Sequence, residues 1–528
     1  MAAPTRTPTR LPRRAFLKTS ALFGVWAALA ACNPRAAPDE EQDRAATGTP
    51  PHDHAASPTP AATAAPPTAA PTVPPASGDA VLAHGLRRLT FGATPQLEAH
   101  ARQVGVDAFI EEQLHPEAIA DDAVEARVSQ FATFSMTPQE RFELERRAQP
   151  VQELIAATLL RQAASARQLY ELVVDFWTNH FNIYILKDQC RTLKTDDDLH
   201  VIRPYALGRF ADLLTASAHS PAMLVYLDQA ASNQDVPNEN YARELMELHT
   251  ISVEAGYTHH DVVEVARALT GWTVSGPRGR MGEPGRFVYA PALHDDGEKH
   301  ILGVHFPAGQ GQGDGDQVLE ILAAHPMTAR FISAKLARRF VSDTPPEAVV
   351  DRLAATFTNT GGDIRAVLAS LFAADEFRGS AGQKTKRPLE FFVSALRVTG
   401  AAVREDARPI YDHLALMGQA PFQWAPPDGY PDAASYWMTT SGLLNRWNFG
   451  MLLTGGLLRG AQVNLSALTA DAASPADVVD VLAQRFTGER LPGDARDILV
   501  DFASTGDLGD NLPAIAGLLL GSPHFQMR

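Results

Sequence analysis

The sequence predicts a mainly α-helical protein with a large multi-helix body, and three observations support this fold class. From Ala80 onward, apolar residues recur at spacings of three and four, as they do on one face of an amphipathic helix. Start and stop signals flank several of these segments, such as the capping-box pair Thr258 and Asp261 and the stop signal Gly271. The exception is a Gly-rich stretch, residues 273–315, whose two alternating runs predict a short β-hairpin or long-loop insertion.

The first element in chain order is an export signal over residues 1–32. It has a basic start without Asp or Glu, followed by an apolar run over residues 21–31. Residues 12–18, Pro-Arg-Arg-Ala-Phe-Leu-Lys, resemble a twin-arginine signal, which is read by a translocase that moves folded proteins. Residues 29–32, Leu-Ala-Ala-Cys, resemble a lipobox, in which Cys32 is lipidated and becomes the first residue of the mature protein.

A short transmembrane anchor is the alternative for this segment. The apolar run covers eleven residues, which is about half of the roughly 20 that a membrane-spanning helix needs. We therefore expect an exported protein that is anchored at the extracytoplasmic face of the membrane through lipidated Cys32. Cleavage at Cys32 and retention of the signal as an anchor both stay open at this point.

The second element, residues 33–79, is dominated by Ala, Pro and Thr. Such a segment lacks the large apolar side chains that would offset its ordering entropy, so we expect a disordered tether. The whole chain carries a net charge of −15, which argues against nucleic acid as a partner. If Cys32 is lipidated, Cys190 has no disulfide partner, and this fits a body that folds in the reducing cytoplasm before export.

The third element is the helical body, residues 80–528. Each predicted helix in it is a segment whose apolar residues fall on one face. The alternating runs 286–290 and 300–306 flank Asp295-Asp296-Gly297, which favours the turn of a hairpin. The predicted helices cover residues 150–162, 167–186, 238–251, 258–272, 326–341, 345–357, 362–372, 388–398, 434–458, 475–486 and 512–520.

A polar stripe runs along the otherwise apolar helix 167–186. Buried carboxylates are costly unless they are paired or hydrogen-bonded, so this stripe must face partners, water or a ligand. An internal hydrogen-bond network and one wall of a pocket are the two interpretations. His180 lies on the opposite, aromatic side, where a satisfied core histidine is the favoured interpretation. The stripe consists of Glu171, Asp175, Thr178, Asn179 and Asn182.

The helix 238–251 carries a second polar face, and its members are Asn240, Arg243, Glu244 and Glu247. On a solvated surface helix, such residues form weak pairs four positions apart. Alternatively, Glu244 and Glu247 beside an Asn and an Arg suit a metal ion or a polar ligand. The Glu-x-x-His spacing of di-iron helices is absent here.

Two further segments carry candidate residues. His294 and Asp295 precede a glycine in the insertion, where they are either catalytic or metal-binding, or serve the turn itself. The Pro-rich loop, residues 418–432, contains Trp424 and Tyr430. Aromatic side chains on a stiff backbone suit stacking on sugar rings or gripping a partner, and the alternative is packing onto the helices.

These segments together resemble the DUF1800 family, large bacterial proteins of uncharacterised function. The resemblance extends over residues 80–528 and implies an exported helical protein with no established reaction or catalytic residues. Members are often encoded beside a second exported family that resembles alkaline phosphatases and sulfatases, which implies a shared surface role. The motifs that carry it are Leu86-Arg-Arg-Leu-Thr-Phe-Gly-Ala-Thr-Pro95, Asp175-Phe-Trp-Thr-Asn-His-Phe-Asn182, Asn238-Glu-Asn-Tyr-Ala-Arg-Glu-Leu-Met-Glu-Leu-His249, Ala266-Arg-Ala-Leu-Thr-Gly-Trp272, His294-Asp295 with Lys299, and Pro427-Asp-Gly-Tyr430.

Three functional hypotheses follow. The first is a membrane-tethered lipoprotein that binds or acts on an extracellular polymer, such as a polysaccharide, or an exported partner protein. The second is a metal-dependent hydrolase with a carboxylate and histidine site between helices 167–186 and 238–251, and it draws on Asp175, Glu244, Glu247, His294 and Asp295. The third is a cofactor that is inserted before folded export, although the sequence identifies no cofactor. In the first, the Pro-rich loop and the polar stripes line a cleft, whereas the second depends on whether the polar faces of the two helices meet in an accessible pocket.

Overall fold

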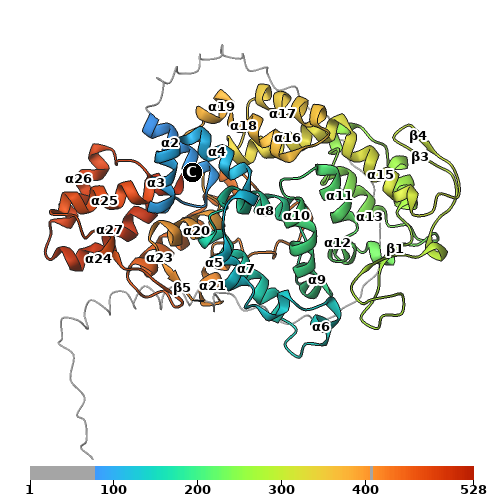
Figure 1. The fold of residues 1–528 in the computed structure, drawn as a ribbon, viewed down its shortest axis with the longest axis horizontal. Helices are drawn as coiled ribbons and strands as arrows, with labels where there is room; N and C mark the ends of the chain where they lie inside the picture. The colour runs from blue at the N-terminus through green and yellow to red at the C-terminus, as the bar shows by residue number, and fades with distance from the viewer. Residues whose placement is uncertain (1–77, 405–407) are drawn as a thin grey trace, which may run out of the picture. The chain divides into compact units, whose positions relative to one another are not determined.

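The computed structural model describes residues 78–404 and 408–528, drawn in colour in Figure 1. The predicted signal with Cys32 lies outside the described residues, and so does the tether except for its last two positions. Helices dominate, and the strands of the described chain form only two-stranded antiparallel sheets. The mainly α-helical fold class is therefore confirmed. No helix within the described ranges combines the length and the apolar character needed to cross a bilayer.

The first half of the body is built from helices that follow one another closely. Predicted start signals are used here: Thr258 caps α14 and exchanges hydrogen bonds with Asp261 in a capping box. The helices are α2 (Gly78–Leu89), α3 (Pro95–Val104), α4 (Val106–Leu114), α5 (Asp122–Val128), α6 (Pro138–Glu143), α7 (Gln149–Ala164), α8 (Gln168–His180), α9 (Cys190–Asp197), α10 (Arg203–Tyr205), α11 (Phe210–Ala218), α12 (Pro221–Tyr226), α13 (Glu239–Glu247) and α14 (His259–Ala268).

The second half is also helical after the insertion. His325 caps α16, where its side chain accepts a hydrogen bond from the Met327 N–H. The elements are α15 (Gly313–Ala324), α16 (Pro326–Phe340), α17 (Glu347–Thr360), α18 (Ile364–Phe372), α19 (Asp375–Arg378), α20 (Pro388–Val398), β5 (Ala402–Val403), α21 (Arg408–Leu416), α22 (Ala434–Trp437), α23 (Thr440–Thr454), β6 (Ala461–Gln462), α24 (Leu465–Leu468), α25 (Pro475–Thr487), α26 (Gly493–Ala503), α27 (Leu508–Gly521) and α28 (Pro523–Gln526).

Two predicted helices differ most from their expected bounds. The helix expected over 167–186 ends at His180, and two residues later the Asn182 side chain donates hydrogen bonds to the carbonyl groups of Trp424 and Pro426. The helix expected over 434–458 is divided into α22 and α23, because Thr439 caps a new helix start. In both places a tertiary or capping contact overrides the local pattern.

The insertion contains two hairpins, where the sequence predicts one. The strand β2 (Phe287–Tyr289) pairs with β1 (Trp272–Val274), and β3 (Lys299–Ile301) pairs with β4 (Val304–Phe306). The two alternating runs therefore do not pair with each other. Leu302 and Gly303 join β3 to β4 with φ of 50° and 80°, which is the left-handed backbone of a two-residue hairpin turn.

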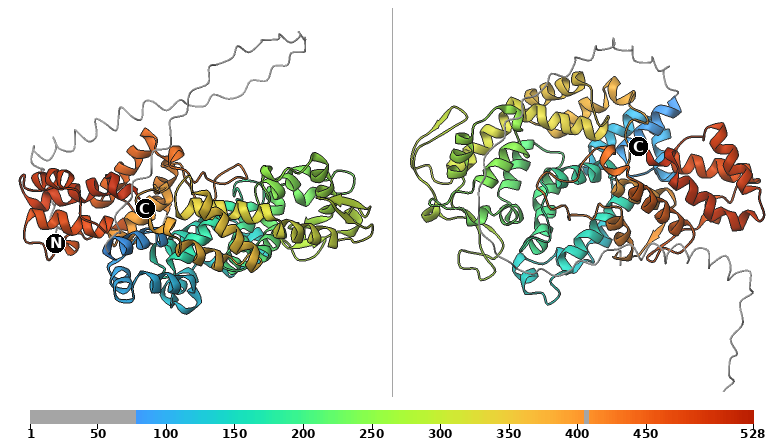
Figure 2. Two further views of the ribbon diagram at one scale, coloured as in Figure 1. Left: turned by 90° about the horizontal axis from the view of Figure 1, so that it is seen from above. Right: turned by 180° about the vertical axis from the view of Figure 1, so that it is seen from behind.

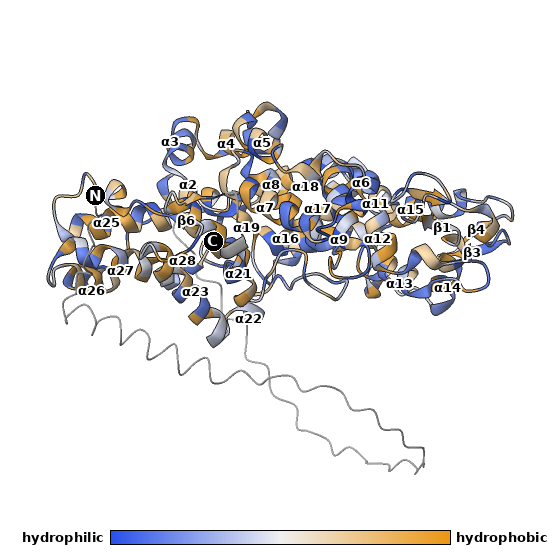
Figure 3. Ribbon diagram, turned by 90° about the horizontal axis from the view of Figure 1, so that it is seen from below, coloured by the Kyte–Doolittle hydropathy of each residue, from blue (hydrophilic) through white to orange (hydrophobic). Residues whose placement is uncertain are grey.

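A single large hydrophobic core links the helices, and Trp177 of α8 is fully buried in it. Figure 3 shows hydrophobic and hydrophilic residues alternating around individual helices, as expected for amphipathic helices. Cys190 is also fully buried, and burial raises the pKa of its thiol to about 12. The thiol therefore stays protonated at neutral pH, which supports a structural role.

Segments from both ends of the described chain meet in this body. The views in Figures 1 and 2 place the C-terminal end beside α2. Arg528 donates a hydrogen bond of 2.7 Å to the carbonyl group of Arg88, 440 positions away in the sequence. The contact is buried, so it belongs to the core and not to a loose terminus.

Candidate functional site

A buried cluster of alternating charges lies where α8, α16 and α20 meet. Glu390, in the first turn of α20, accepts hydrogen bonds from Arg339 and Arg528. Asp175 of α8 accepts hydrogen bonds from Arg387 and, at 3.2 Å, from Arg339. Burial alone would raise the pKa of Glu390, but Arg339, Arg528 and Arg387 outweigh it and hold that pKa below its usual value. We call these five residues the ion-pair cluster.

The other acidic member of the polar stripe has an arginine partner too. Glu171 forms two parallel hydrogen bonds with Arg203, at 2.9 and 3.0 Å, and Asp198 accepts a third from Arg203 at 2.8 Å. Bidentate arginine pairs of this kind are the strong ones in buried sites. Both carboxylates of the stripe are thus engaged inside the protein.

The amides of the stripe hold the Pro-rich loop. Asn179 donates to the Tyr430 carbonyl group at 2.9 Å and accepts from the Tyr430 N–H at 2.8 Å. The hydroxyl group of Tyr430 donates to the Ala420 carbonyl group, and Tyr430 is buried. Trp424 is half-buried, and its indole N–H donates to Asp428 at 2.8 Å. The stripe therefore fixes the loop against α8.

A pocket of about 290 Å³ lies between α8, α16, the start of α20 and the Pro-rich loop. We call it the α8–α16 pocket. It is large enough for part of a sugar or another small polar ligand, since known ligand pockets start near a few hundred Å³. Its lining combines aromatic, cationic and acidic side chains, namely Phe176, Asn179, His180, Leu248, Phe331, Lys335, Arg338, Arg339, Arg387, Asp428, Gly429, Tyr430, Pro431 and Asp432.

Lys335 and His180 form the most unusual pair in this pocket. The ammonium group of Lys335 donates a 2.8 Å hydrogen bond to Nδ1 of His180, whose Nε2 lies 3.1 Å from the His249 carbonyl oxygen. This pattern assigns the His180 proton to Nε2 and leaves Nδ1 as an acceptor. Burial and the Lys335 charge hold the pKa of His180 well below its usual value, so the imidazole is neutral.

The surroundings of Lys335 change the pKa of its ammonium group. Burial, followed by the nearby charge of Arg338, lowers the pKa of Lys335 to about 8, against the weaker opposite effect of Asp428 and Asp432. Asp432 is occupied by Lys384, at 2.8 Å. Lys335 thus presents a half-buried cation whose proton is exchangeable near neutral pH, and this combination is common at functional sites.

The second predicted polar face lies beside Asp428 of the α8–α16 pocket, but none of its four residues lines that pocket. Glu244 is half-buried beside Glu247 and Asp428, and burial and the Glu247 charge raise its pKa. Asn240 is exposed and Arg243 half-buried. Asp175 is bonded to Arg387 and Arg339, whereas Glu244 has the like-charged Glu247 beside it, so the two carboxylates have different surroundings.

The hypothesis of a metal-dependent hydrolase requires several metal-ligating side chains close together. Within residues 78–404 and 408–528, no three His, Cys, Asp or Glu side chains are grouped as a metal site would need. Glu244 and Glu247 thus form a pair of carboxylates without a third ligand of these types.

The candidates in the insertion do not line the α8–α16 pocket. His294 is buried, with Nε2 at 3.2 Å from Asp314 and Nδ1 at 2.8 Å from the Thr270 carbonyl oxygen. Asp295 pairs with Arg267 at 2.7 Å and accepts the Gly297 N–H at 3.0 Å, as in an Asx turn. Their contacts connect the insertion to α14 and α15.

Sequence reasoning missed the cations of the pocket. Lys335 and Arg339 stand four residues apart on α16, on the same side as Phe331, and a basic pair on an apolar face was the available signal. In the sequence they read as ordinary basic residues near a helix C-terminus. Their partners lie on α8 and α20, far away along the chain.

The comparisons with known proteins identify the family of the chain. A family model described as "Protein of unknown function (DUF1800)" matches residues 84–527, a range that contains every element of the pocket and of the ion-pair cluster apart from Arg528. No curated protein and no solved structure matches the chain. Because the family model covers most of the sequence, the chain belongs to the DUF1800 family.

Proposed function

We propose that this protein is an exported, membrane-tethered lipoprotein that binds an acidic polysaccharide in the α8–α16 pocket. The observation that carries the proposal is Lys335, a half-buried cation at 2.8 Å from a neutral histidine in a pocket with aromatic walls. A cation beside aromatic side chains suits a sugar ring that bears a carboxylate.

The neighbours of Lys335 support an anionic ligand. Arg338 is exposed at the same pocket, whereas Arg339 and Arg387 are already engaged by Asp175 and Glu390. Lys335 and Arg338 are therefore the cations left to meet a ligand carboxylate. Asp428 is exposed at the same pocket and suits hydroxyl groups of a sugar.

The attachment to the membrane gives the first testable prediction. We expect Cys32→Ser to release the protein from the membrane fraction and to abolish incorporation of labelled fatty acid, because the lipid anchor needs the Cys32 thiol. Cys190→Ala is the matched control, since it removes the other cysteine and should leave the protein at the membrane. Equal membrane retention of the two variants would contradict the lipid anchor.

Binding in the pocket gives the second prediction. We expect Lys335→Gln to weaken the affinity for a soluble uronic acid polymer about tenfold, since it removes one charge-assisted hydrogen bond. Affinity of the unchanged protein should fall as the pH rises through about 8, because Lys335 is charged below its pKa and neutral above it. Calorimetric titrations at about pH 6.5 and about pH 9.5 measure both effects.

The control variant for this experiment is Arg330→Gln. Arg330 lies on the same helix, but it pairs on the surface with Glu347 and Asp351, so binding should not change. A neutral glucose polymer should bind weakly to every variant. If the uronic acid polymer binds Lys335→Gln as tightly as the unchanged protein, the proposed site is wrong. Binding of an acidic peptide alone would favour the exported partner protein over the polysaccharide.

A second candidate function is β-elimination on the same polymer, favoured by the Lys335–His180 pair. Arg338 would neutralise a uronate carboxylate, and the neutral Lys335 amine would take the proton from the adjacent carbon. The bond to the leaving sugar oxygen then breaks, and that oxygen takes a proton from water. Such activity would rise with pH through about 8, opposite to binding, because it needs the neutral amine. Absorbance of the new conjugated double bond detects it.

A further inference from the structure

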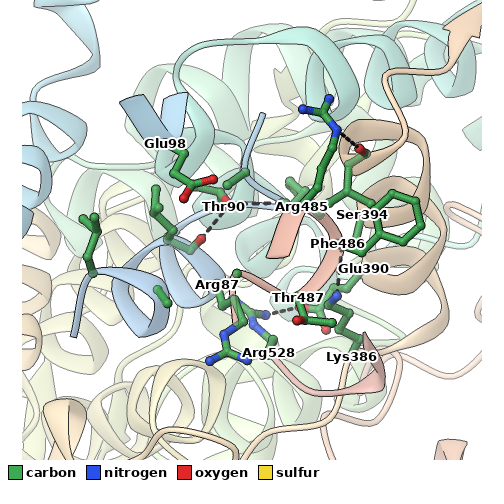
Figure 4. Close-up of a pocket in the computed structure, with 18 of the residues that line it drawn as sticks. Arg87, Thr90, Glu98, Lys386, Glu390, Ser394, Arg485, Phe486, Thr487 and Arg528 are labelled. Carbon is green, nitrogen blue, oxygen red and sulfur yellow. Dashed lines mark hydrogen bonds and ion pairs between the residues drawn. The ribbon is translucent and has the colours of Figure 1, made fainter. Parts of the chain in front are cut away.

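A second cavity, of about 40 Å³, lies between α2, α20 and α25 (Figure 4), and it shares no lining residue with the α8–α16 pocket. Cationic side chains outnumber carboxylates around it. Its carboxylates are Glu98 and Glu390, and its cations include Arg87, Lys386, Arg485 and Arg528, with the hydroxyl groups of Ser394 and Thr487 beside them. Figure 4 shows these side chains converging from helices that lie far apart in the sequence.

Lys386 is the central group of this cavity. It is only 7% exposed, and its ammonium group donates a 2.9 Å hydrogen bond to the Ser394 hydroxyl oxygen. The ring centroid of Phe525 lies 3.6 Å from the same nitrogen. Burial, and then the charges of Arg87, Arg528 and Arg446, hold the pKa of Lys386 well below its usual value, although Glu390 opposes them.

Two carboxylates line the cavity, and both are already engaged: Glu98 pairs with Arg102 at 2.8 Å, and Glu390 is shared. It accepts hydrogen bonds from Arg339 and Arg528 and from the backbone N–H of Arg387. Arg87 is paired with Glu489 at the opening of the cavity, where the Arg87 side chain is 18% exposed. No carboxylate of the described residues is therefore left to neutralise Lys386.

Two buried arginines near this cavity add to the excess of positive charge. Arg88 donates to the Ser380 carbonyl group, and its Nε and Nη1 have no hydrogen-bond partner within the described residues. Arg446 donates to Gln526, and its Nε and Nη2 are also without a partner there. Burial lowers the pKa of Arg88 to about 9 and that of Arg446 to about 10, so both stay charged at neutral pH.

We infer that this cavity is a binding site for a small anionic group, of the size of phosphate, sulfate or a single carboxylate, held by Lys386 with Arg87 and Arg528. Uncompensated buried charge is costly, and a bound anion would relieve the mutual repulsion of these cations. A cavity of this volume accepts a group of only a few heavy atoms. The site shares no lining residue with the proposed polysaccharide pocket, although Glu390 in its wall is bonded to Arg339 of that pocket, and the inference does not rest on the proposed function.

Thermal unfolding of the full chain in increasing inorganic phosphate tests this inference. We expect a saturable rise in Tm of about 1 to 3 °C, because phosphate would bind the folded protein only. Lys386→Met should abolish the saturable part, since methionine keeps the packing on Phe525 and loses the charge. Lys335→Gln should keep it, because Lys335 lies in the other pocket. Loss of the response in Lys335→Gln and retention in Lys386→Met would overturn the assignment.

Two more variants keep the test decisive if Lys386→Met fails to fold. Arg87→Gln alters the opening of the cavity without entering the core and should weaken the phosphate response at least several-fold. Arg496→Gln, which breaks a surface pair with Asp480, is its matched control and should leave the response unchanged. A linear, non-saturating increase of Tm in all variants would be a general salt effect and would overturn the proposal.

Discussion

Glu390→Gln is expected to destabilise the protein by about 3 to 5 kcal/mol, the cost of breaking a buried ion pair by removing one partner. The substitution keeps the shape of the side chain but leaves Arg339, Arg387 and Arg528 with Asp175 as their nearest carboxylate in the cluster. Because Glu390 also accepts the Arg387 N–H at the start of α20, the first turn of that helix should loosen. Chemical denaturation measures the change in the free energy of unfolding.

Glu376→Gln is the matched control for that measurement. Glu376 forms two hydrogen bonds with Arg352, at 2.9 and 3.0 Å, on the protein surface. Exposed pairs contribute about 1 kcal/mol or less, so this variant should unfold nearly like the unchanged protein. If both variants lose the same stability, the ion-pair cluster is not what holds α8, α16 and α20 together.

The loss of stability caused by Glu390→Gln should also depend on pH. The pKa of Glu390 is depressed in the folded protein, so its stabilising effect is present above the unfolded pKa of about 4.5. The effect is lost as the pH falls below that value toward the folded pKa. The gap between Glu390→Gln and the unchanged protein should therefore narrow on acidification.

Gly429→Ala has the second largest expected effect, and it acts on the Pro-rich loop. Gly429 has φ of 77°, and a Cβ atom there would lie 2.2 Å from the Asn179 carbonyl oxygen. The left-handed backbone alone costs alanine about 1 to 2 kcal/mol, and the clash forces the loop away from α8. We expect loss of the hydrogen bonds between Asn179 and Tyr430, faster hydrogen exchange over residues 420–432, and loss of polysaccharide binding.

Gly456→Ala separates the effect of the left-handed backbone from the effect of the clash. Gly456 has φ of 67°, but a Cβ atom there would meet nothing within 4 Å. This variant pays only the backbone strain and should keep both the loop and the binding. If Gly429→Ala behaves like Gly456→Ala, the close approach of the loop to Asn179 does not matter for the pocket.

Local sequence patterns were sufficient to predict most of the helices, and tertiary contacts explain the exceptions. The capping box at Thr258 and the apolar period along 388–398 depend on near neighbours, and α14 and α20 start close to the predicted residues. The end of α8 depends on Asn182 and a loop more than 240 positions further along the chain. No window of local sequence contains that contact.

In the candidate site, too, local sequence patterns reveal some residues, and tertiary contacts determine the rest. The stripe with Asp175 and Asn179 stood out because polar residues interrupted an apolar helix, but of its members only Asn179 lines the α8–α16 pocket. Lys335 did not stand out, because its partner His180 is 155 residues away and its lowered pKa arises only after folding. Whether Glu244, Glu247, His294 and Asp295 have functional roles stays a prediction.

The hydrogen bond from Arg528 to the Arg88 carbonyl group has a consequence for the order of events during synthesis. The first helix of the body cannot complete its packing until the ribosome has added a residue 440 positions later. Long-range closure of this kind delays the completion of folding until residue 528 has been added. A translocase that threads the chain from its N-terminus would place the two halves of this contact in different compartments. A translocase for folded proteins keeps them together, as the twin-arginine-like start of the chain would require.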